Sequence, residues 1–140
     1  MAGNYNQSLM NDRKLVHVER IAIRWGDMDA MGHVNNTVYF RYMEQARISW
    51  FDTLKSKDPW RGTGVVVAST ACNFKRPLNY PGTVEVRVLA GAPGGSSVPT
   101  FYELVIGDDL YAEGTATVVF IDLEKQKPVR IPQKIREAIQ

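Results

Sequence analysis

The sequence has a single cysteine, Cys72, two histidines and no long apolar run. One cysteine cannot form an internal disulfide, so nothing in the chain points to secretion. Its few cysteine and histidine side chains do not match the ligand spacing of a zinc site, and we expect no metal ion. No apolar run approaches the roughly 20 residues needed to span a bilayer, and the N-terminus lacks the basic-then-apolar order of a signal peptide. We therefore expect a cytoplasmic protein.

The chain also lacks a strong excess of either charge. Seventeen basic and fifteen acidic side chains give a net charge of +2, whereas a nucleic-acid-binding domain usually carries a much larger basic excess. Nucleic acid is therefore not an expected partner. A length of 140 residues with 44% hydrophobic residues fits one globular domain. Residues 1–13 are mostly polar and aperiodic, which predicts a flexible N-terminal arm before a single domain at 14–140.

The first half of the domain predicts a strand, a loop and a long helix. Residues 14–25 are enriched in β-branched side chains with partial alternation, which indicates a strand. Residues 26–35 form a loop that ends at the first of two paired asparagines, and Asn35 or Asn36 can cap the helix that follows from about 37 to 55. The helix is apolar over most of its circumference, with a narrow polar line, so we expect it to be largely enclosed. The main apolar face consists of Tyr39, Met43, Ala46, Trp50 and Leu54, widened by Phe40, Ile48 and Phe51.

The second half predicts strands. Four strands are expected at 64–75, 83–89, 99–106 and 110–121, with a hairpin turn at 107–109 and a short terminal helix at 132–139. Consecutive strands with turn signals favour antiparallel pairing, and an enclosed helix needs a sheet curved around it. We therefore predict an α+β fold in which a curved antiparallel sheet wraps around one long central helix, as in the hotdog fold. Such a sheet leaves edges open, so we expect a homodimer or homotetramer.

Acidic and imidazole side chains gather in the loop directly before the helix. Asp27, Asp29 and His33 lie within one short segment. A carboxylate can act as a general base toward water or attack a carbonyl directly. Free amides at a helix N-terminus can hold a developing oxyanion. The segment therefore has the components that thioester hydrolysis needs.

The same segment carries a family resemblance. The run 27–36 (DMDAMGHVNN), followed by Tyr39, Glu44 and Arg47, resembles the 4-hydroxybenzoyl-CoA thioesterases of the hotdog superfamily. Its GHVNN portion also resembles the plant acyl-ACP thioesterases. The likeness covers most of the chain, from about residue 14 to 132. It implies an acyl-CoA thioesterase, with acyl-ACP as another candidate substrate and with no cofactor, since coenzyme A is part of the substrate.

The resemblance also implies roles for individual residues. The catalytic aspartate of the family falls on Asp29, and the histidine of the acyl-ACP enzymes falls on His33, while Met31 stands where those enzymes have asparagine. The amide that binds the oxyanion falls near Asn36.

Other residues are candidates for substrate binding. These are Tyr39 as a pocket residue, Glu44, which has a minor catalytic claim, and Lys75 and Arg76 as contacts for the phosphates of coenzyme A. Each candidate also has a structural interpretation. Tyr39 also fits core or dimer packing, Lys75 and Arg76 fit a solvated strand end, and His33 fits an ordinary loop histidine that bonds the backbone. Asp27 is expected to bond loop amides, and Glu44 and Arg47, three residues apart on the helix, are expected to pair with each other. Cys72 is interpreted as a packing residue within a strand.

Two other functions stay open at this point, because one fold can host several activities. A hotdog enoyl-CoA hydratase or dehydratase usually places its histidine five residues after the aspartate, whereas His33 follows Asp29 by four and Asp27 by six. A noncatalytic acyl-CoA-binding module would bind its ligand without turnover. The Asp-x-Asp and GHVNN runs favour the thioesterase.

Overall fold

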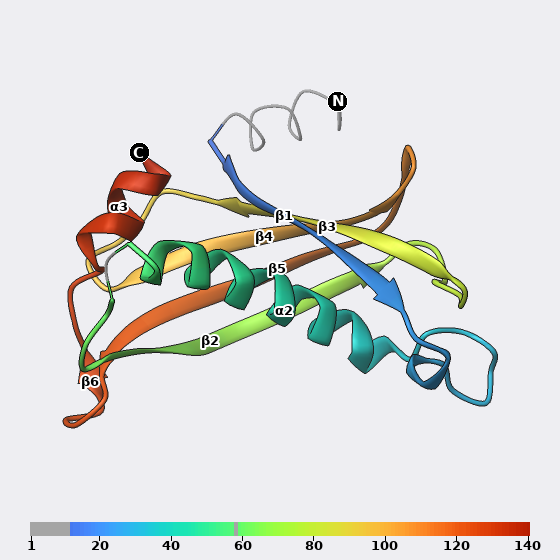
Figure 1. Ribbon diagram of the computed structural model, residues 1–140, viewed down its shortest axis with the longest axis horizontal. Helices are drawn as coiled ribbons and strands as arrows, with labels where there is room; N and C mark the ends of the chain where they lie inside the picture. Colours follow the sequence, from blue (N-terminus) through green and yellow to red (C-terminus); the bar gives the residue numbers. More distant parts are fainter. Residues whose placement is uncertain (1–11, 58) are drawn as a thin grey trace.

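The computed structural model describes residues 12–57 and 59–140, in which one long helix lies against a curved sheet (Figure 1). The predicted central helix is α2 (Asn36–Lys55), and it follows β1 (Lys14–Ile23) and a 3₁₀ turn, η1 (Trp25–Asp27). The remaining elements are β2 (Thr63–Phe74), β3 (Gly82–Ala90), β4 (Ser97–Ile106), β5 (Asp109–Asp122), β6 (Lys127–Pro128) and α3 (Gln133–Ile139). The two-residue strand β6 was not predicted, because it is too short to show a periodic pattern.

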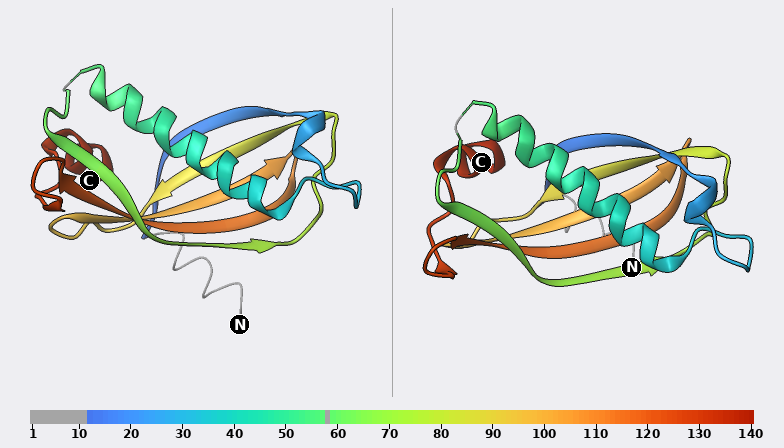
Figure 2. Two further views of the ribbon diagram at one scale, coloured as in Figure 1. Left: turned by 90° about the horizontal axis from the view of Figure 1, so that it is seen from below. Right: turned by 60° about the horizontal axis from the view of Figure 1, so that its bottom comes forward.

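The sheet is antiparallel throughout the described residues and has the order β1-β3-β4-β5-β2, with β6 pairing β5. Figure 1 shows α2 running along one face of this sheet, and the views in Figure 2 show the sheet curving around the helix. This arrangement confirms the predicted α+β hotdog architecture. It also places the loop that precedes α2 at one end of the sheet.

The strand order differs from the order along the chain at one place. Strand β2 lies at an edge of the sheet and pairs with β5, not with β3, which follows it in sequence. The connecting segment 75–81 is fastened to the start of α2, because Val34 donates a backbone hydrogen bond to the Leu78 carbonyl at 2.8 Å. The Leu78 N–H in turn donates to the Tyr39 hydroxyl at 2.9 Å. These bonds hold the crossover against the helix N-terminus.

Helix α2 buries the apolar face that its spacing predicts. The side chains of Tyr39, Met43, Ala46 and Trp50 are all at most 2% exposed, and Leu54 is partly buried. Ile48 is an exception, since 44% of it stays exposed. The sheet opposes this face with small and branched residues on its inner side, which lets a helix lie close to it. These residues are Val84, Val86, Val88, Leu104, Ala112, Ala116 and Val118.

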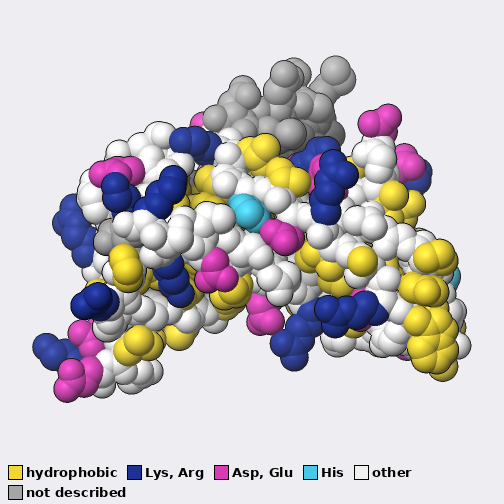
Figure 3. Space-filling model, in the orientation of Figure 1, with side chains coloured by type: hydrophobic (Ala, Val, Ile, Leu, Met, Phe, Trp, Pro, Cys, Tyr) yellow, Lys and Arg dark blue, Asp and Glu magenta, His cyan; other side chains and the backbone are white. Residues whose placement is uncertain are grey.

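Surface charges of both signs are mixed on the face drawn in Figure 3. No large field of one sign covers that face, as the small net charge leads us to expect.

Of the predicted N-terminal arm, residues 1–11 lie outside the described part of the chain. Arg13 is described, and its guanidinium carbon lies 3.6 Å from the ring centre of Phe101. Within 12–57 and 59–140, no helix is long and apolar enough to cross a membrane.

Candidate active site

The carboxylate of Asp29 is held in a fixed orientation by its own loop. One oxygen, Oδ1, accepts from the Met31 N–H at 2.9 Å, and the other, Oδ2, accepts from the side-chain amide of Asn35 at 2.9 Å. The loop closes through backbone bonds from Asp29 N–H to the His33 carbonyl and from Gly32 N–H to the Asp29 carbonyl, both 3.0 Å long. Gly32 has a φ of +81°, a conformation that side-chain-bearing residues rarely adopt. Asp29 itself is solvent-exposed.

Asn35 joins this carboxylate to the start of α2. Its side-chain oxygen accepts from the Thr37 N–H at 3.0 Å and so caps the helix, while its amide nitrogen donates to Asp29. Asn36 is the first residue of α2, so its N–H has no acceptor within the helix. The partial positive charge of the helix N-terminus is therefore directed toward the site. The sequence predicted a cap at Asn35 or Asn36, but it gave no sign that Asn35 also bonds Asp29.

A cavity of about 230 Å³ lies beside this helix start. It collects five of the predicted site residues, and Asp29 and Glu44 are not part of its lining. The lining consists of His33, Val34, Asn36, Tyr39, Phe74, Lys75, Arg76 and Pro77. Segments that are about forty residues apart in the chain therefore meet at the N-terminus of α2.

Tyr39 contributes a buried ring whose hydroxyl is hydrogen-bonded to the backbone of segment 76–78. The hydroxyl accepts from the Leu78 N–H and donates to the Arg76 carbonyl at 3.3 Å. Burial raises the pKa of the Tyr39 hydroxyl, although the bond from Leu78 works in the opposite direction. Tyr39 thus offers the cavity an apolar wall and a neutral phenol, while its polar atom positions segment 76–78.

Lys75 and Arg76 lie at the mouth of the cavity with exposed side chains. Arg76 Nη1 is 3.2 Å from Asp109 Oδ2, and Lys75 Nζ is 4.0 Å from Glu113 Oε2. Both pairs are solvent-exposed, and exposed pairs of this kind are worth little. The two cations can therefore exchange these partners for a ligand anion at low cost.

The predicted pairing of Glu44 with Arg47 is wrong. Glu44 instead pairs with Arg41 at 3.2 Å, at the rim of a separate groove of about 380 Å³ between α2 and β1. Arg47 is only 8% exposed, and its Nη1 donates to the hydroxyl of Tyr102 at 3.0 Å. Position 47 faces the sheet while position 44 faces outward, so the two side chains diverge. Glu44 is thereby separated from the cavity at the helix start.

Asp27 has a fastening role in the same loop. Its Oδ2 accepts from the Arg24 N–H at 2.9 Å and from the Tyr42 hydroxyl at 2.7 Å. Burial and the bond to Asp27 raise the pKa of Tyr42, so its phenol stays protonated and keeps donating. Asp27 therefore ties the 3₁₀ turn η1 to helix α2. The expected bond to a loop amide is present, together with a bond to the helix that the sequence did not reveal.

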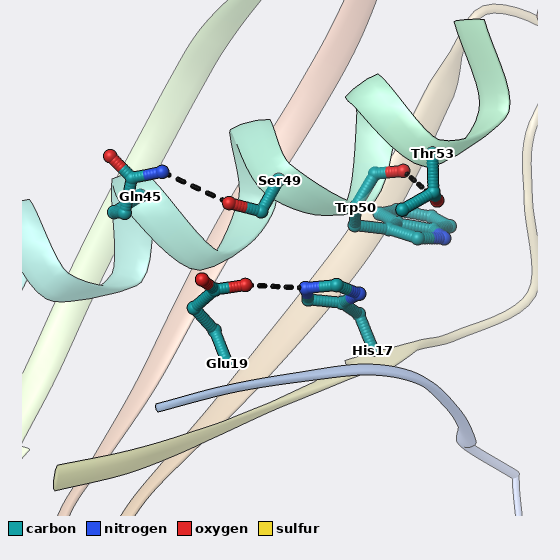
Figure 4. Close-up of polar contacts among 6 residues, drawn as sticks. All are labelled: His17, Glu19, Gln45, Ser49, Trp50 and Thr53. Carbon is teal, nitrogen blue, oxygen red and sulfur yellow. Dashed lines mark hydrogen bonds and ion pairs between the residues drawn. The ribbon is translucent and has the colours of Figure 1, made fainter. Parts of the chain in front are cut away.

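The two histidines lie in different environments. His17 pairs with Glu19 at 2.8 Å on β1, and Figure 4 shows this pair facing the Gln45–Ser49 hydrogen bond of α2. His33 instead lies at the cavity, where its Nδ1 is 2.9 Å from the side chain of Asn79. Asn79 comes from the crossover between β2 and β3, and no local pattern in the sequence marks it as part of the site. Within residues 12–57 and 59–140, no three His, Cys, Asp or Glu side chains form a metal-binding group.

Cys72 lies on β2 and lines a larger cavity of about 420 Å³, together with Arg13, Glu103 and Glu113. Burial raises the pKa of its thiol to about 11. The thiolate is the nucleophilic form, so Cys72 is a weak nucleophile at neutral pH. The larger volume therefore does not by itself make this cavity a reaction centre. The start of α2 offers a carboxylate and a backbone N–H, whereas this cavity offers a thiol that stays protonated at neutral pH.

We predict that Cys72 in the folded protein reacts slowly with a disulfide reagent at pH 7.5. The rate should rise about tenfold per pH unit and level off near the raised pKa. Stopped-flow labelling between pH 7 and pH 11 measures this, with urea-unfolded protein as the reference. A plateau near pH 8.5, the value of a free thiol, would contradict the raised pKa.

Comparison with known proteins places the chain in a family. The chain belongs to the thioesterase-like superfamily, whose family model matches residues 23–139. A solved structure from Pseudomonas aeruginosa, described as "a putative thioesterase", is 38% identical with a TM-score of 0.83, covering 89% of this chain and 98% of that one. A Xanthomonas campestris structure, described as "a putative acyl-CoA thioesterase", is 35% identical with a TM-score of 0.74, covering 84% and 100%.

A curated relative agrees with these structures. The long-chain acyl-CoA thioesterase FadM of Escherichia coli is 27% identical over 130 residues, which cover 86% of this chain and 95% of that protein. The predicted membership of the hotdog thioesterases is thus confirmed, and so is the enzyme class, thioester hydrolase.

Proposed function

We propose that this protein hydrolyses an acyl-CoA to the free acid and coenzyme A, with Asp29 as its catalytic carboxylate. The observation that carries the proposal is the link from Asp29 through Asn35 to the N-terminus of α2. It connects this carboxylate to the helix start, where Asn36, the first residue of α2, lines a cavity. The acyl-CoA thioesterase names of FadM and of the Xanthomonas structure support coenzyme A, rather than an acyl carrier protein, as the carrier.

The chemistry follows from the positions of these groups. The thioester carbonyl oxygen accepts from the N–H of Asn36, which stabilises the negative charge that develops as the carbon is attacked. Asp29 either attacks that carbon, giving a mixed anhydride that water then cleaves, or takes a proton from an attacking water. In both routes the C–S bond breaks and the thiolate of coenzyme A leaves and is protonated. No cofactor takes part, because coenzyme A enters as part of the substrate.

The remaining cavity residues are assigned to binding. Lys75 and Arg76, exposed at the cavity mouth, attract the phosphates of coenzyme A, and Tyr39 forms a wall of the cavity. Glu44 lies in the other groove and pairs with Arg41, so we give it no part in the reaction. His33 lines the cavity and assists at the carbonyl.

We further propose that two copies pair through β2, as a homodimer or as half of a homotetramer. Strand β2 is an edge strand, and its side chains at 66–71 are exposed, among them Val66 at 44% and Val67 at 40%. An open edge with apolar side chains is prone to pair with another chain. Analytical ultracentrifugation tests this: a species of 15.8 kDa at micromolar concentration would contradict it.

We also propose that the protein is located in the cytoplasm. The single cysteine, Cys72, supports this location because it cannot form an internal disulfide.

The activity is tested by measuring coenzyme A release from short, long and aromatic acyl-CoAs. Product is best quantified by chromatography, which avoids any signal from the Cys72 thiol. Turnover above the spontaneous rate would support the proposal and rank the acyl groups. Hydration of an enoyl-CoA without coenzyme A release, or binding without turnover, would replace it with the hydratase or the binding module.

A further inference from the structure

The side chain of Asn79 has one orientation that its surroundings permit. Its end nearest His33 lies 2.9 Å from His33 Nδ1 and 2.9 Å from the carbonyl oxygen of Gly32. A carbonyl oxygen only accepts hydrogen bonds, so the Asn79 atom facing it must be the amide nitrogen. The opposite orientation would set two oxygens against each other. The nitrogen also approaches the Leu78 carbonyl at 3.2 Å, which favours the same orientation.

The orientation of Asn79 decides where His33 carries its proton. An amide NH₂ donates to Nδ1, so Nδ1 must be the acceptor nitrogen of the neutral ring. The proton of the neutral imidazole is then on Nε2. The backbone around Asn79 is firmly placed, because neighbouring Leu78 is fully buried and both its N–H and its carbonyl are hydrogen-bonded to the α2 region.

We propose that Asn79 is a positioning residue that holds His33 as the Nε2–H tautomer and so makes it a hydrogen-bond donor at the cavity. His33 then stabilises an oxygen of the ligand, in a role additional to that of the Asn36 amide, and it does not act as a general base. The donor role rests on the proposed thioesterase activity. The tautomer itself does not depend on that activity, which allows the two to be tested separately.

The tautomer is measured by two-dimensional ¹H–¹⁵N NMR of the histidine side chains at a pH where His33 is neutral. Only His17 and His33 contribute signals, and His33→Gln identifies which are which. We expect the Nε2–H tautomer for His33 in the wild-type protein. A predominant Nδ1–H tautomer would overturn the proposal, whatever the enzyme activity.

Variants of Asn79 test whether this residue is the cause. Asn79→Asp replaces the donor by a carboxylate, which accepts from Nδ1–H, so the tautomer should reverse. Asn79→Ala removes the constraint and should give a mixture of tautomers. Gln133→Glu on α3 adds the same charge far from the site and should leave the His33 signals unchanged. An unchanged tautomer in folded Asn79→Asp and Asn79→Ala would refute the role of Asn79.

The donor role is tested by kinetics on the acyl-CoA that the enzyme turns over fastest. Glutamine can place an N–H close to where histidine has Nε2, but it cannot act as a base near neutral pH. His33→Gln should therefore retain more of kcat than His33→Ala, for which we expect a loss of roughly tenfold, the usual scale of one hydrogen bond. Equal losses in both variants would exclude the donor role. No turnover in the wild type would refute the proposed function, and the NMR result would still decide the tautomer.

Discussion

Replacing Asp29 by asparagine is expected to lower kcat for acyl-CoA hydrolysis by about 10³-fold, within the range that loss of a catalytic acid–base group causes. Asparagine keeps the shape of the side chain and can still accept from the Met31 N–H. It cannot attack a carbonyl carbon or accept a proton from water near neutral pH. KM should change little, because the binding residues lie in the neighbouring cavity. Steady-state kinetics on purified, folded protein measure both constants.

Asp27→Asn is the matched control, since it makes the same chemical change two residues away in the same loop. Its side-chain oxygen can still accept from Arg24 or Tyr42, the partners that Asp27 has now. We expect kcat within a few-fold of the wild type. If Asp27→Asn abolishes turnover while Asp29→Asn retains it, the catalytic assignment of the two aspartates is reversed.

Leu104→Ala is expected to lower the free energy of unfolding by about 3–4 kcal/mol, as large-to-small changes in a close-packed core do. Leu104 is 0% exposed on β4 and lies between Val86 of β3 and Ala112 of β5 in register. Its inner side faces the layer occupied by α2, so truncation leaves a cavity that neighbours on three sides cannot easily fill. Urea denaturation followed by circular dichroism measures the change.

Leu15→Ala removes the same atoms from an exposed position and serves as the control. Leu15 lies on edge strand β1 and is 52% exposed, so the expected loss is within about 0.5 kcal/mol. Equal losses in the two variants would mean that β4 is not the centre of the core. The slope of unfolding against urea should be the same in both variants if each unfolds in one step.

Local patterns were sufficient for most elements of this fold. The apolar spacing of Tyr39, Met43, Ala46 and Trp50 predicted both the length and the buried face of α2. Helix periodicity repeats within a few residues, so a single segment carries the whole signal. The candidate catalytic groups could also be predicted from one short segment of the sequence. Asp29, His33 and the helix start are within eight residues, which placed them together before any tertiary contact was known.

Contacts between residues far apart in the chain could not be predicted from the sequence. Nothing local indicates that β2 pairs with β5 at the sheet edge, because many strand orders satisfy the same alternating pattern. The contact between His33 and Asn79 joins residues 46 apart. The burial of Arg47 was missed for a related reason: helix spacing favoured a pair with Glu44, whereas the Tyr102 hydroxyl, 55 residues away, provides its actual partner.

The sequence by itself determined the central helix and the loop that carries Asp29, because each of these depends on neighbours along the chain, and its resemblance to a known family indicated the enzyme class. The tertiary structure alone decided which side chains surround that loop. The crossover 75–81 is fastened to α2 by the Tyr39 hydroxyl and the Val34 amide, and this brings Lys75, Arg76 and Asn79 to the helix N-terminus. Hydrogen bonds between distant segments form only after the chain has collapsed around its core, so no local pattern encodes them.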